Sequence, residues 1–381
     1  MSTDDRIKRL NTAMLSTELD AYLALTTSDI RWLTGFSKVF DEEKAHALLV
    51  TSTRLKADPQ RLLHTDMRYS GSIRPQSSGV LEVLDDERKP HSQFLVEQLE
   101  ALLAKASTHT ETLRIGVEAE MPLNAYRALD KSLADAGFSA YELVELPGFI
   151  QNLRAIKDPE EIASIKAAQS ITDAGFLHLL EYIKPGLSEF EVAVELEFYL
   201  RRMGSEGVAF GAIVGSGPNG ANPHAVPGDR QIQRGDLIVL DFGAKLDDYR
   251  SDMTRTVAVG PASERQRQIY GTVLQAQLTA LEMMKAGLAC VKPFDRVNEI
   301  FAEQGFGNLE HGLGHGVGID IHEAPVLASK AEGDLAVGHV VTVEPGIYIA
   351  GYAGVRIEDF GAVTAEGFDN FTASTKELIE I

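Results

Sequence analysis

The sequence is poor in several features on which whole classes of protein depend. Only one of its 381 residues, Cys290, is a cysteine, so an intramolecular disulfide and a cysteine-rich zinc site are both excluded. Nowhere do about 18 uncharged apolar residues run together, and no apolar segment follows the charged start, so we expect neither a membrane span nor a signal peptide. With Cys290 interpreted as a small core residue, these features predict a cytoplasmic protein.

Positive charge is also scarce. The chain has 36 Lys+Arg against 56 Asp+Glu, and its net charge of -20 repels phosphate backbones and anionic lipid. We therefore expect no nucleic-acid partner and no membrane partner. What remains is an ordinary globular composition, 44% hydrophobic, in a chain long enough for two domains with a core each.

The pattern between residues 147 and 158 predicts a domain boundary. Pro147-Gly148 interrupts the pattern of helices and strands. The start of a helix is then expected at Asp158, with Asp158 as the N-cap, Pro159 at the first helical position and Glu161 at the third. Short apolar runs mixed with helical patterns precede this point. We expect a smaller α/β domain over 1–150 and a second domain over 158–381.

The second domain repeats one plan. Two helices, from about 158 to 183 and from 188 onward, precede β-rich segments at 236–243 and 252–259. Helices at 264–286 and 294–304 precede further β-rich segments at 339–349 and 355–363. This repeat predicts an α+β fold with a pseudo-two-fold, curved antiparallel sheet and helices on one face. In the second helix, Ser188 and Glu191 form a capping box, and a buried stripe is predicted at Phe190, Val194 and Phe198.

Four acidic residues stand in apolar, β-rich surroundings: Asp241, Asp252, Glu344 and Glu358. Burying an isolated carboxylate is costly, so each one needs a partner. Strand periodicity places polar groups on one side of the sheet, where the four carboxylates would converge. Two divalent ions would offset their charge, whereas any one acid taken alone could equally form a salt bridge or cap a turn.

A glycine-rich segment adds imidazoles to this pattern. It reads HGLGHGVG from His311 to Gly318, includes His315, and contains too many glycines for a stable helix, so close backbone packing is expected. One histidine among oxygen ligands suits Mn²⁺, Co²⁺ or Fe²⁺ better than a structural zinc site. His224, between two prolines, and His322, on an alternating run, are uninformative in isolation.

These residues together resemble a known metallopeptidase family, which includes aminopeptidase P, prolidase and methionine aminopeptidase and has the pita-bread fold. The resemblance rests on Asp241 in LDFGAKLDDYRSDMTRT, His315 in HGLGHGVGIDIHE, Glu344 in TVEPGIYI and Glu358 in GVRIEDFGAV. The first domain is similar to that of the prolyl branch, a creatinase-type N-terminal domain, through DIRWLTGF at 29–36, DMRY at 66–69 and NLRAIK at 152–157. The resemblance therefore favours enzymes that cleave an Xaa-Pro bond.

The resemblance also implies a role for each site residue. It makes Asp241 a chelating ligand of one metal, Asp252 and Glu358 the bridging carboxylates, and His315 and Glu344 ligands of the second metal. Glu344 is in addition the expected proton carrier. His224 and His322 match two substrate-side histidines, Arg356 would orient a carboxylate or donate to the site, and His311 would line the pocket. The cofactors implied are two divalent ions, Mn²⁺ first, with Co²⁺, Fe²⁺ and Zn²⁺ as alternatives.

The expected enzyme is accordingly an aminopeptidase P or a prolidase that acts on a proline-containing peptide, and the resemblance implies a homodimer. One alternative is a small-molecule C–N hydrolase or a lyase on the same scaffold, because fold does not fix the substrate. Another is a catalytically silent binding protein, against which the complete set of ligand-type residues argues.

Overall fold

The computed structural model describes residues 2–381 except 41–42, 44, 56–59, 78–80, 85–88, 106–111 and 139. The chain divides into two compact units, Met1–Arg154 and Ala155–Ile381. Among the described residues, no helix combines the length and the apolar character needed to cross a membrane.

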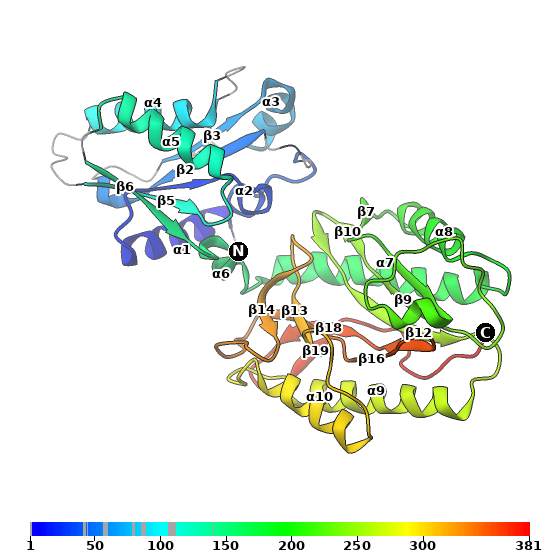
Figure 1. Cartoon of the computed structure of the whole chain (residues 1–381). Helices are drawn as coiled ribbons and strands as arrows, with labels where there is room; N and C mark the ends of the chain where they lie inside the picture. Colours follow the sequence, from blue (N-terminus) through cyan, green and yellow to red (C-terminus); the bar gives the residue numbers. More distant parts are fainter. Residues whose placement is uncertain are drawn as a thin grey trace. The chain divides into compact units, whose positions relative to one another are not determined.

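The first unit is an α/β domain built on one sheet (Figure 1). Its strands are β1 (Ala21–Ala24), β2 (His46–Thr51), β3 (Arg61–Thr65), β4 (Leu81–Leu84), β5 (Leu113–Glu118) and β6 (Tyr141–Leu146), in the order β4-β3-β2-β1-β5-β6. Its helices are α1 (Thr3–Ser16), α2 (Thr27–Thr34), α3 (Met67–Ile73), α4 (His91–Lys105), α5 (Leu123–Asp135) and α6 (Phe149–Arg154). Apolar side chains of the sheet pack against α4 and α5 in a continuous core.

The second unit follows the predicted order of two helices, strands, two helices and strands. Its helices are α7 (Pro159–Tyr182), α8 (Glu189–Arg202), α9 (Glu264–Met283) and α10 (Lys292–Glu303). Figure 1 shows α7 and α8 in the upper part of this unit and α9 and α10 along its lower edge. Each helix pair packs into a core of its own, and the core of α9 and α10 also includes Leu237 and Ala258 from the first half of the unit.

Hydrogen bonding divides the strands of this unit into four groups. One half contributes β8 (Ile213–Ser216), β9 (Leu237–Phe242) and β12 (Met253–Ala258), in the order β12-β9-β8. The other half contributes β13 (Gly314–Gly316), β14 (Glu323–Leu327), β15 (Val340–Val343), β18 (Asp359–Val363) and β19 (Phe368–Asn370), in the order β14-β13-β15-β18-β19. Smaller groups are β7 (Gly207–Val208) with β10 (Ala244–Leu246) and β11 (Tyr249–Arg250), and the hairpin of β16 (Gly346–Ile349) and β17 (Ala353–Arg356).

Local sequence signals account for the starts of the first two helices of this unit. Asp158 accepts hydrogen bonds from the backbone N–H groups of Glu160 and Glu161, and Glu161 in return accepts from the N–H of Asp158. Ser188 and Glu191 form the same reciprocal arrangement at α8. The predicted N-cap at Asp158 and the predicted capping box at Ser188 are therefore confirmed, and each satisfies N–H groups that a helix start leaves without partners.

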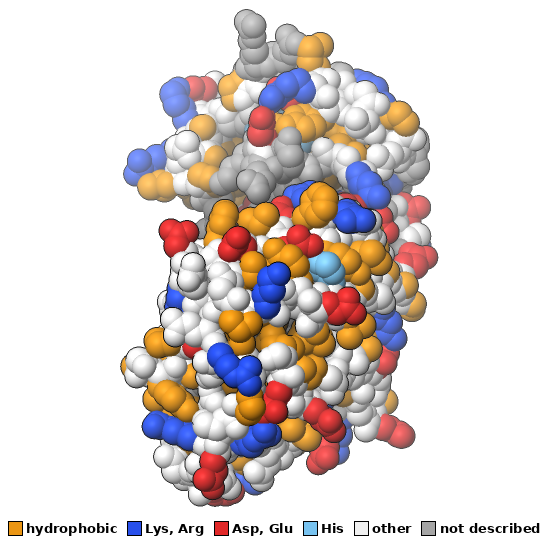
Figure 2. Space-filling model, turned by 90° about the vertical axis from the view of Figure 1, so that its right-hand side faces the viewer, with side chains coloured by type: hydrophobic (Ala, Val, Ile, Leu, Met, Phe, Trp, Pro, Cys, Tyr) orange, Lys and Arg blue, Asp and Glu red, His pale blue; other side chains and the backbone are white. Residues whose placement is uncertain are grey.

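The predicted buried stripe of α8 is wrong. Phe190, Val194 and Phe198 are each more than half exposed, and the side that faces the core carries Val192 and Leu196 instead. Figure 2 shows hydrophobic side chains gathered on the side of the molecule that lies to the right in Figure 1, where α8 is labelled. Because α8 has an apolar stripe on both sides, its periodicity alone could not identify the one that packs inward.

Candidate dinuclear metal centre

Side chains from both halves of the second unit meet at one point. Asp241 lies on β9 and Asp252 directly precedes β12, while Glu358 directly precedes β18. A hydrogen bond of 3.1 Å from the backbone N–H of Glu358 to the carbonyl of Thr254 joins the halves beside these acids. The convergence expected from strand periodicity is thus present in the folded chain.

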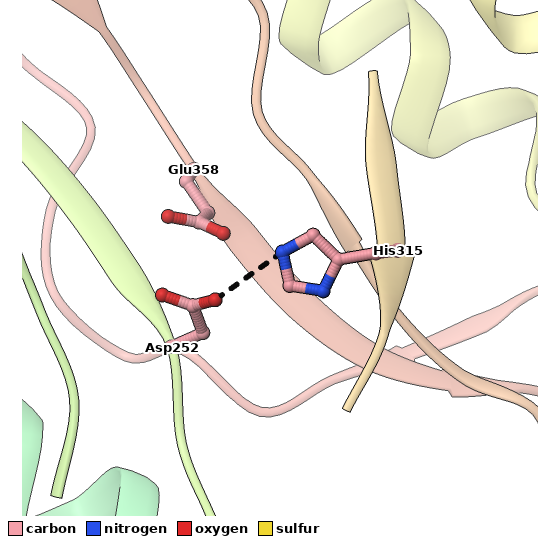
Figure 3. A group of neighbouring side chains, drawn as sticks. All are labelled: Asp252, His315 and Glu358. Atoms are coloured by element: carbon pink, nitrogen blue, oxygen red, sulfur yellow. Dashed lines mark ion pairs between the residues drawn. The ribbon is translucent and has the colours of Figure 1, made fainter. Parts of the chain in front are cut away.

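His315 and Glu344 complete the cluster from the C-terminal half. The side-chain ligand atoms of Asp252, His315 and Glu358 all lie within 4.8 Å of one another (Figure 3). His315 Nε2 is 3.6 Å from Asp252 Oδ2 and 3.4 Å from Glu344 Oε1. Five residues of ligand type therefore surround one small volume.

Some of the carboxylate oxygens in the cluster are available to bind cations. Asp241, Asp252 and Glu358 are 8%, 4% and 1% exposed. Glu358 accepts one hydrogen bond, at 2.7 Å from the hydroxyl of Thr254, but its Oε1 and Asp241 Oδ1 are buried and find no hydrogen-bond partner anywhere in the described part of the chain. Buried anionic oxygens without donors fit a divalent cation, which supplies the charge that they lack.

The electrostatics of the cluster lead to the same conclusion. Burial raises the pKa of all four carboxyl groups, that of Glu344 to about 8, and repulsion from neighbouring carboxylates raises those of Asp252 and Glu358 further. In the absence of cations, burial and mutual repulsion therefore favour the protonated form of these groups. Metal ions that displace the protons allow all four to be ionised together.

The imidazole ring of His315 has the charge state and the tautomer that a metal ligand needs. Burial lowers its pKa to about 4, so its ring is uncharged at neutral pH. Its Nδ1 lies 3.0 Å from the carbonyl of Gly316, which assigns the proton to Nδ1 and leaves Nε2 with a lone pair toward the acids. The backbone N–H of His315 donates to the hydroxyl of Thr342 at 3.0 Å, which fixes the residue relative to β15.

The glycines around His315 permit close packing of the backbone. A Cβ atom on Gly314 would lie 2.1 Å from the carbonyl oxygen of Thr342, a distance that no side chain tolerates. The expected close backbone approach in this segment is confirmed. It brings β13 near enough to β15 for His315 to reach the carboxylates.

A polar network extends from the acids through Arg356. Its guanidinium pairs with Asp241 and donates to the hydroxyl of Thr254 at 3.1 Å and to the hydroxyl of Tyr348 at 2.8 Å. Tyr348 is in turn 2.9 Å from Nε2 of His311. Arg356 and His311 thus belong to one network with Asp241, and their roles in the reaction stay predictions. Tyr348, which joins them, was not predicted from the sequence. Its position depends on the pairing of β16 with β17, which the sequence did not specify.

A cavity of about 660 Å³ opens beside the cluster. His224, His311, His322 and Arg356 line it together with the five residues of ligand type. The ring centroids of His322 and His315 are 4.4 Å apart, and burial lowers the pKa of His322. The rest of the lining includes the apolar residues Phe210, Ile213, Val226, Ile321 and Val326. All nine site residues expected from the sequence therefore face one cavity.

Comparisons with known proteins agree with this geometry. Residues 163–365 match metallopeptidase family M24, and residues 6–156 match the creatinase/prolidase N-terminal domain. An uncharacterised peptidase of Bacillus subtilis is 35% identical over 98% of this chain and 99% of its own length, and an Xaa-Pro dipeptidase of Pyrococcus furiosus is 36% identical over 82% of this chain and 92% of its own.

Solved structures give the same result. The Xaa-Pro dipeptidase from Bacillus anthracis superposes with a TM-score of 0.89 at 35% identity, and the match covers 100% of both chains. The X-Pro aminopeptidase from Thermotoga maritima gives a TM-score of 0.83 at 29% identity and covers 97% of this chain and 100% of its own. The chain therefore belongs to metallopeptidase family M24, with a creatinase-type α/β domain before a pita-bread catalytic domain and with the dinuclear metal site that this family implies.

Proposed function

We propose that this protein is a dinuclear metal-dependent peptidase that hydrolyses the Xaa-Pro bond of dipeptides. The observation that carries the proposal is the buried cluster of four carboxylates and His315, open on one side to a cavity with further histidines. Relatives described as Xaa-Pro dipeptidases, among them that of Pyrococcus furiosus, support the choice of substrate. Removal of the N-terminal residue from longer peptides is the second candidate, favoured by the similarity to the Thermotoga maritima X-Pro aminopeptidase.

In this proposal five residues hold the two metals: Asp241, Asp252, His315, Glu344 and Glu358. The donor set of carboxylate oxygens with one imidazole favours Mn²⁺, with Co²⁺, Fe²⁺ and Zn²⁺ as alternatives. Divalent ions in such a site polarise the scissile carbonyl and make water a nucleophile at neutral pH. Arg356 orients Asp241 through their ion pair.

The remaining residues handle the substrate and its protons. Glu344, which lines the cavity, would accept the proton that the attacking water loses and deliver it to the proline nitrogen as the bond breaks. His224 and His322 line the cavity and would donate N–H hydrogen bonds to the oxygen that becomes negative at the scissile carbonyl. The imide nitrogen of proline carries no N–H, so a site that needs no donor there suits this bond.

Kinetics of a His322→Ala variant test the proposal. After reconstitution with Mn²⁺, the wild type should release proline from Ala-Pro. The variant should retain its metal and lose about 10²- to 10³-fold in kcat/KM, as for removal of one oxyanion donor. His178→Ala, which removes a partly buried imidazole of α7 paired with Glu195 of α8 and outside the cavity lining, is the control and should leave kcat/KM unchanged. An equal loss in both variants would contradict the role of His322.

We also propose that two copies associate through the exposed stripe of α8. In an antiparallel arrangement about a two-fold axis, the stripe would cover itself, and the acidic first turn of each α8 would approach the basic last turn of its partner. This association would bury Phe190, Val194 and Phe198, which form an apolar patch of a kind that monomeric proteins rarely expose to solvent. The cytoplasmic location and the absence of nucleic-acid and membrane partners stay predictions from the sequence.

A further inference from the structure

The histidine at the cavity edge, His322, stands on a short turn between β13 and β14. We call residues 318–323 the His322 turn. The strand pairing slips between His315 and Gly316, and Gly316 is opposite Glu323. His322 is exposed by its surface area, and its ring contacts that of His315 at a centroid distance of 4.4 Å. The backbone of the turn is held by the residues around it.

A buried ion pair anchors the turn at its end. Lys157 Nζ lies 2.8 Å from Glu323 Oε2, and the two side chains are 1% and 3% exposed. The other oxygen, Glu323 Oε1, accepts the backbone N–H of Asp320 at 3.0 Å. The carboxylate of Glu323 thus links the backbone of the turn to Lys157, which lies 166 positions earlier in the chain.

Lys157 is itself fixed to the sheet that carries the metal ligands. Its backbone N–H donates to the carbonyl of Gly338 at 2.9 Å, and Ile156 pairs with His339 directly before β15. Glu344 follows at the end of that strand. The ammonium group of Lys157 therefore connects the His322 turn with the strand that leads to Glu344.

A second cation holds the opposite side of the turn. The backbone N–H of Arg250 donates to the carbonyl of Gly318 at 2.9 Å, and its guanidinium donates to the carbonyls of Ile319 and Ala209. Inside the turn, a Cβ atom on Gly318 would lie 2.6 Å from a carboxylate oxygen of Glu323. The space between Gly318 and Glu323 is filled, so the turn has little freedom to shift.

From these contacts we infer that Lys157, through Glu323, is a positioning residue for His322. The inference rests on the substrate-side role proposed for His322. A buried ion pair is weak evidence for stability, because desolvation offsets much of its attraction. Its geometric effect is more specific: it holds the backbone that places an otherwise exposed imidazole at the cavity, and placement of a catalytic group is sensitive to shifts of about 1 Å.

The test replaces the ion pair by neutral side chains of similar size, Lys157→Met with Glu323→Gln, so that no charge is left buried alone. Stability should change little, whereas kcat on Ala-Pro should fall about 10- to 100-fold, with KM and Mn²⁺ content nearly unchanged. The control is the pair Lys166→Met with Asp369→Asn, which removes an exposed ion pair of the same unit at 2.7 Å. It should behave as wild type.

Two further measurements separate positioning from a general structural effect. In a His322→Ala background, the Lys157/Glu323 substitutions should lower kcat less than about 2-fold, because the group that they position is gone. An equal loss in both backgrounds, or wild-type kcat in the double variant, would overturn the inference.

Amide hydrogen exchange provides a readout that needs no activity. Residues 318–323 should exchange at least about 10-fold faster in the double variant, while β9 and β12 stay protected. Failure of the wild type to cleave Ala-Pro would refute the proposed function and leave this readout intact. Unchanged exchange would refute the positioning role itself.

Discussion

Raising the pH should destabilise the metal-free protein, because Glu344 must then ionise within a buried group of carboxylates. Burial raises the pKa of Glu344 from 4.5 to about 8. Between these values the folded state binds more protons than the unfolded state, so stability falls as pH rises. The contribution of Glu344 is complete below pH 4.5 and lost above about pH 8.

The size of the effect follows from the width of this window. At about 1.4 kcal/mol per pH unit, the whole window corresponds to about 5 kcal/mol. The side chain of Glu344 remains 16% exposed, so water reduces the cost of its ionisation. We therefore expect about 3 kcal/mol from Glu344 alone.

Urea denaturation in the presence of a chelator, at pH 5, 6, 7 and 8, measures this directly. Glu344→Gln has nearly the same shape and cannot ionise, so its stability should fall less steeply and exceed that of wild type by about 3 kcal/mol at pH 8. Glu366→Gln changes an exposed residue of the turn before β19 and serves as the control. With Mn²⁺ added, wild type should become the more stable of the two proteins. The metal binds to the carboxylate of Glu344, which the variant lacks. Identical slopes for metal-free wild type and Glu344→Gln would refute the reasoning.

Three further predictions concern other parts of the molecule. Asp252→Asn should lower the metal content measured by elemental analysis and abolish turnover with the circular dichroism spectrum unchanged; full activity would contradict its place among the ligands. Gly314→Ala should lower the free energy of unfolding by about 1–3 kcal/mol, because the new Cβ meets the carbonyl of Thr342. Gly271→Ala in α9 is the control: nothing lies within 4 Å of its new Cβ, and it should raise the free energy of unfolding by up to about 1 kcal/mol. Val194→Glu should convert a dimer into a monomer in light scattering, and a wild type that is already monomeric would remove the proposed association.

How far the sequence could predict this fold depended on whether a signal was local. The capping boxes at Asp158 and Ser188 use residues three positions apart, and both could be recognised in the sequence. The inward face of α8 was assigned wrongly because Val192 and Leu196 compete with an equally apolar opposite stripe. Only the packing of α8 against the rest of its unit decides between the two.

The site residues also divide into those that a local motif predicts and those whose contacts join distant segments of the chain. Asp241, His315 and Glu358 stand in distinctive local motifs, so the sequence alone was enough to predict their convergence. Tyr348 depends on the register of a hairpin, and the pairing of Lys157 with Glu323 joins positions 166 residues apart. Nothing in either local segment indicates its partner, so these contacts could come only from the folded chain.

Product analysis by mass spectrometry tests the central claim most directly. Metal-reconstituted protein would be incubated in parallel with Ala-Pro, Ala-Pro-Ala and Ala-Ala-Ala, with the Asp252→Asn variant as control. The proposed function predicts release of alanine and proline from Ala-Pro, and neither cleavage of Ala-Ala-Ala nor any product from the variant. Cleavage of Ala-Pro-Ala alone would instead assign an aminopeptidase. Metal-loaded protein that cleaves neither proline peptide would contradict the account and favour a small-molecule C–N hydrolase or lyase.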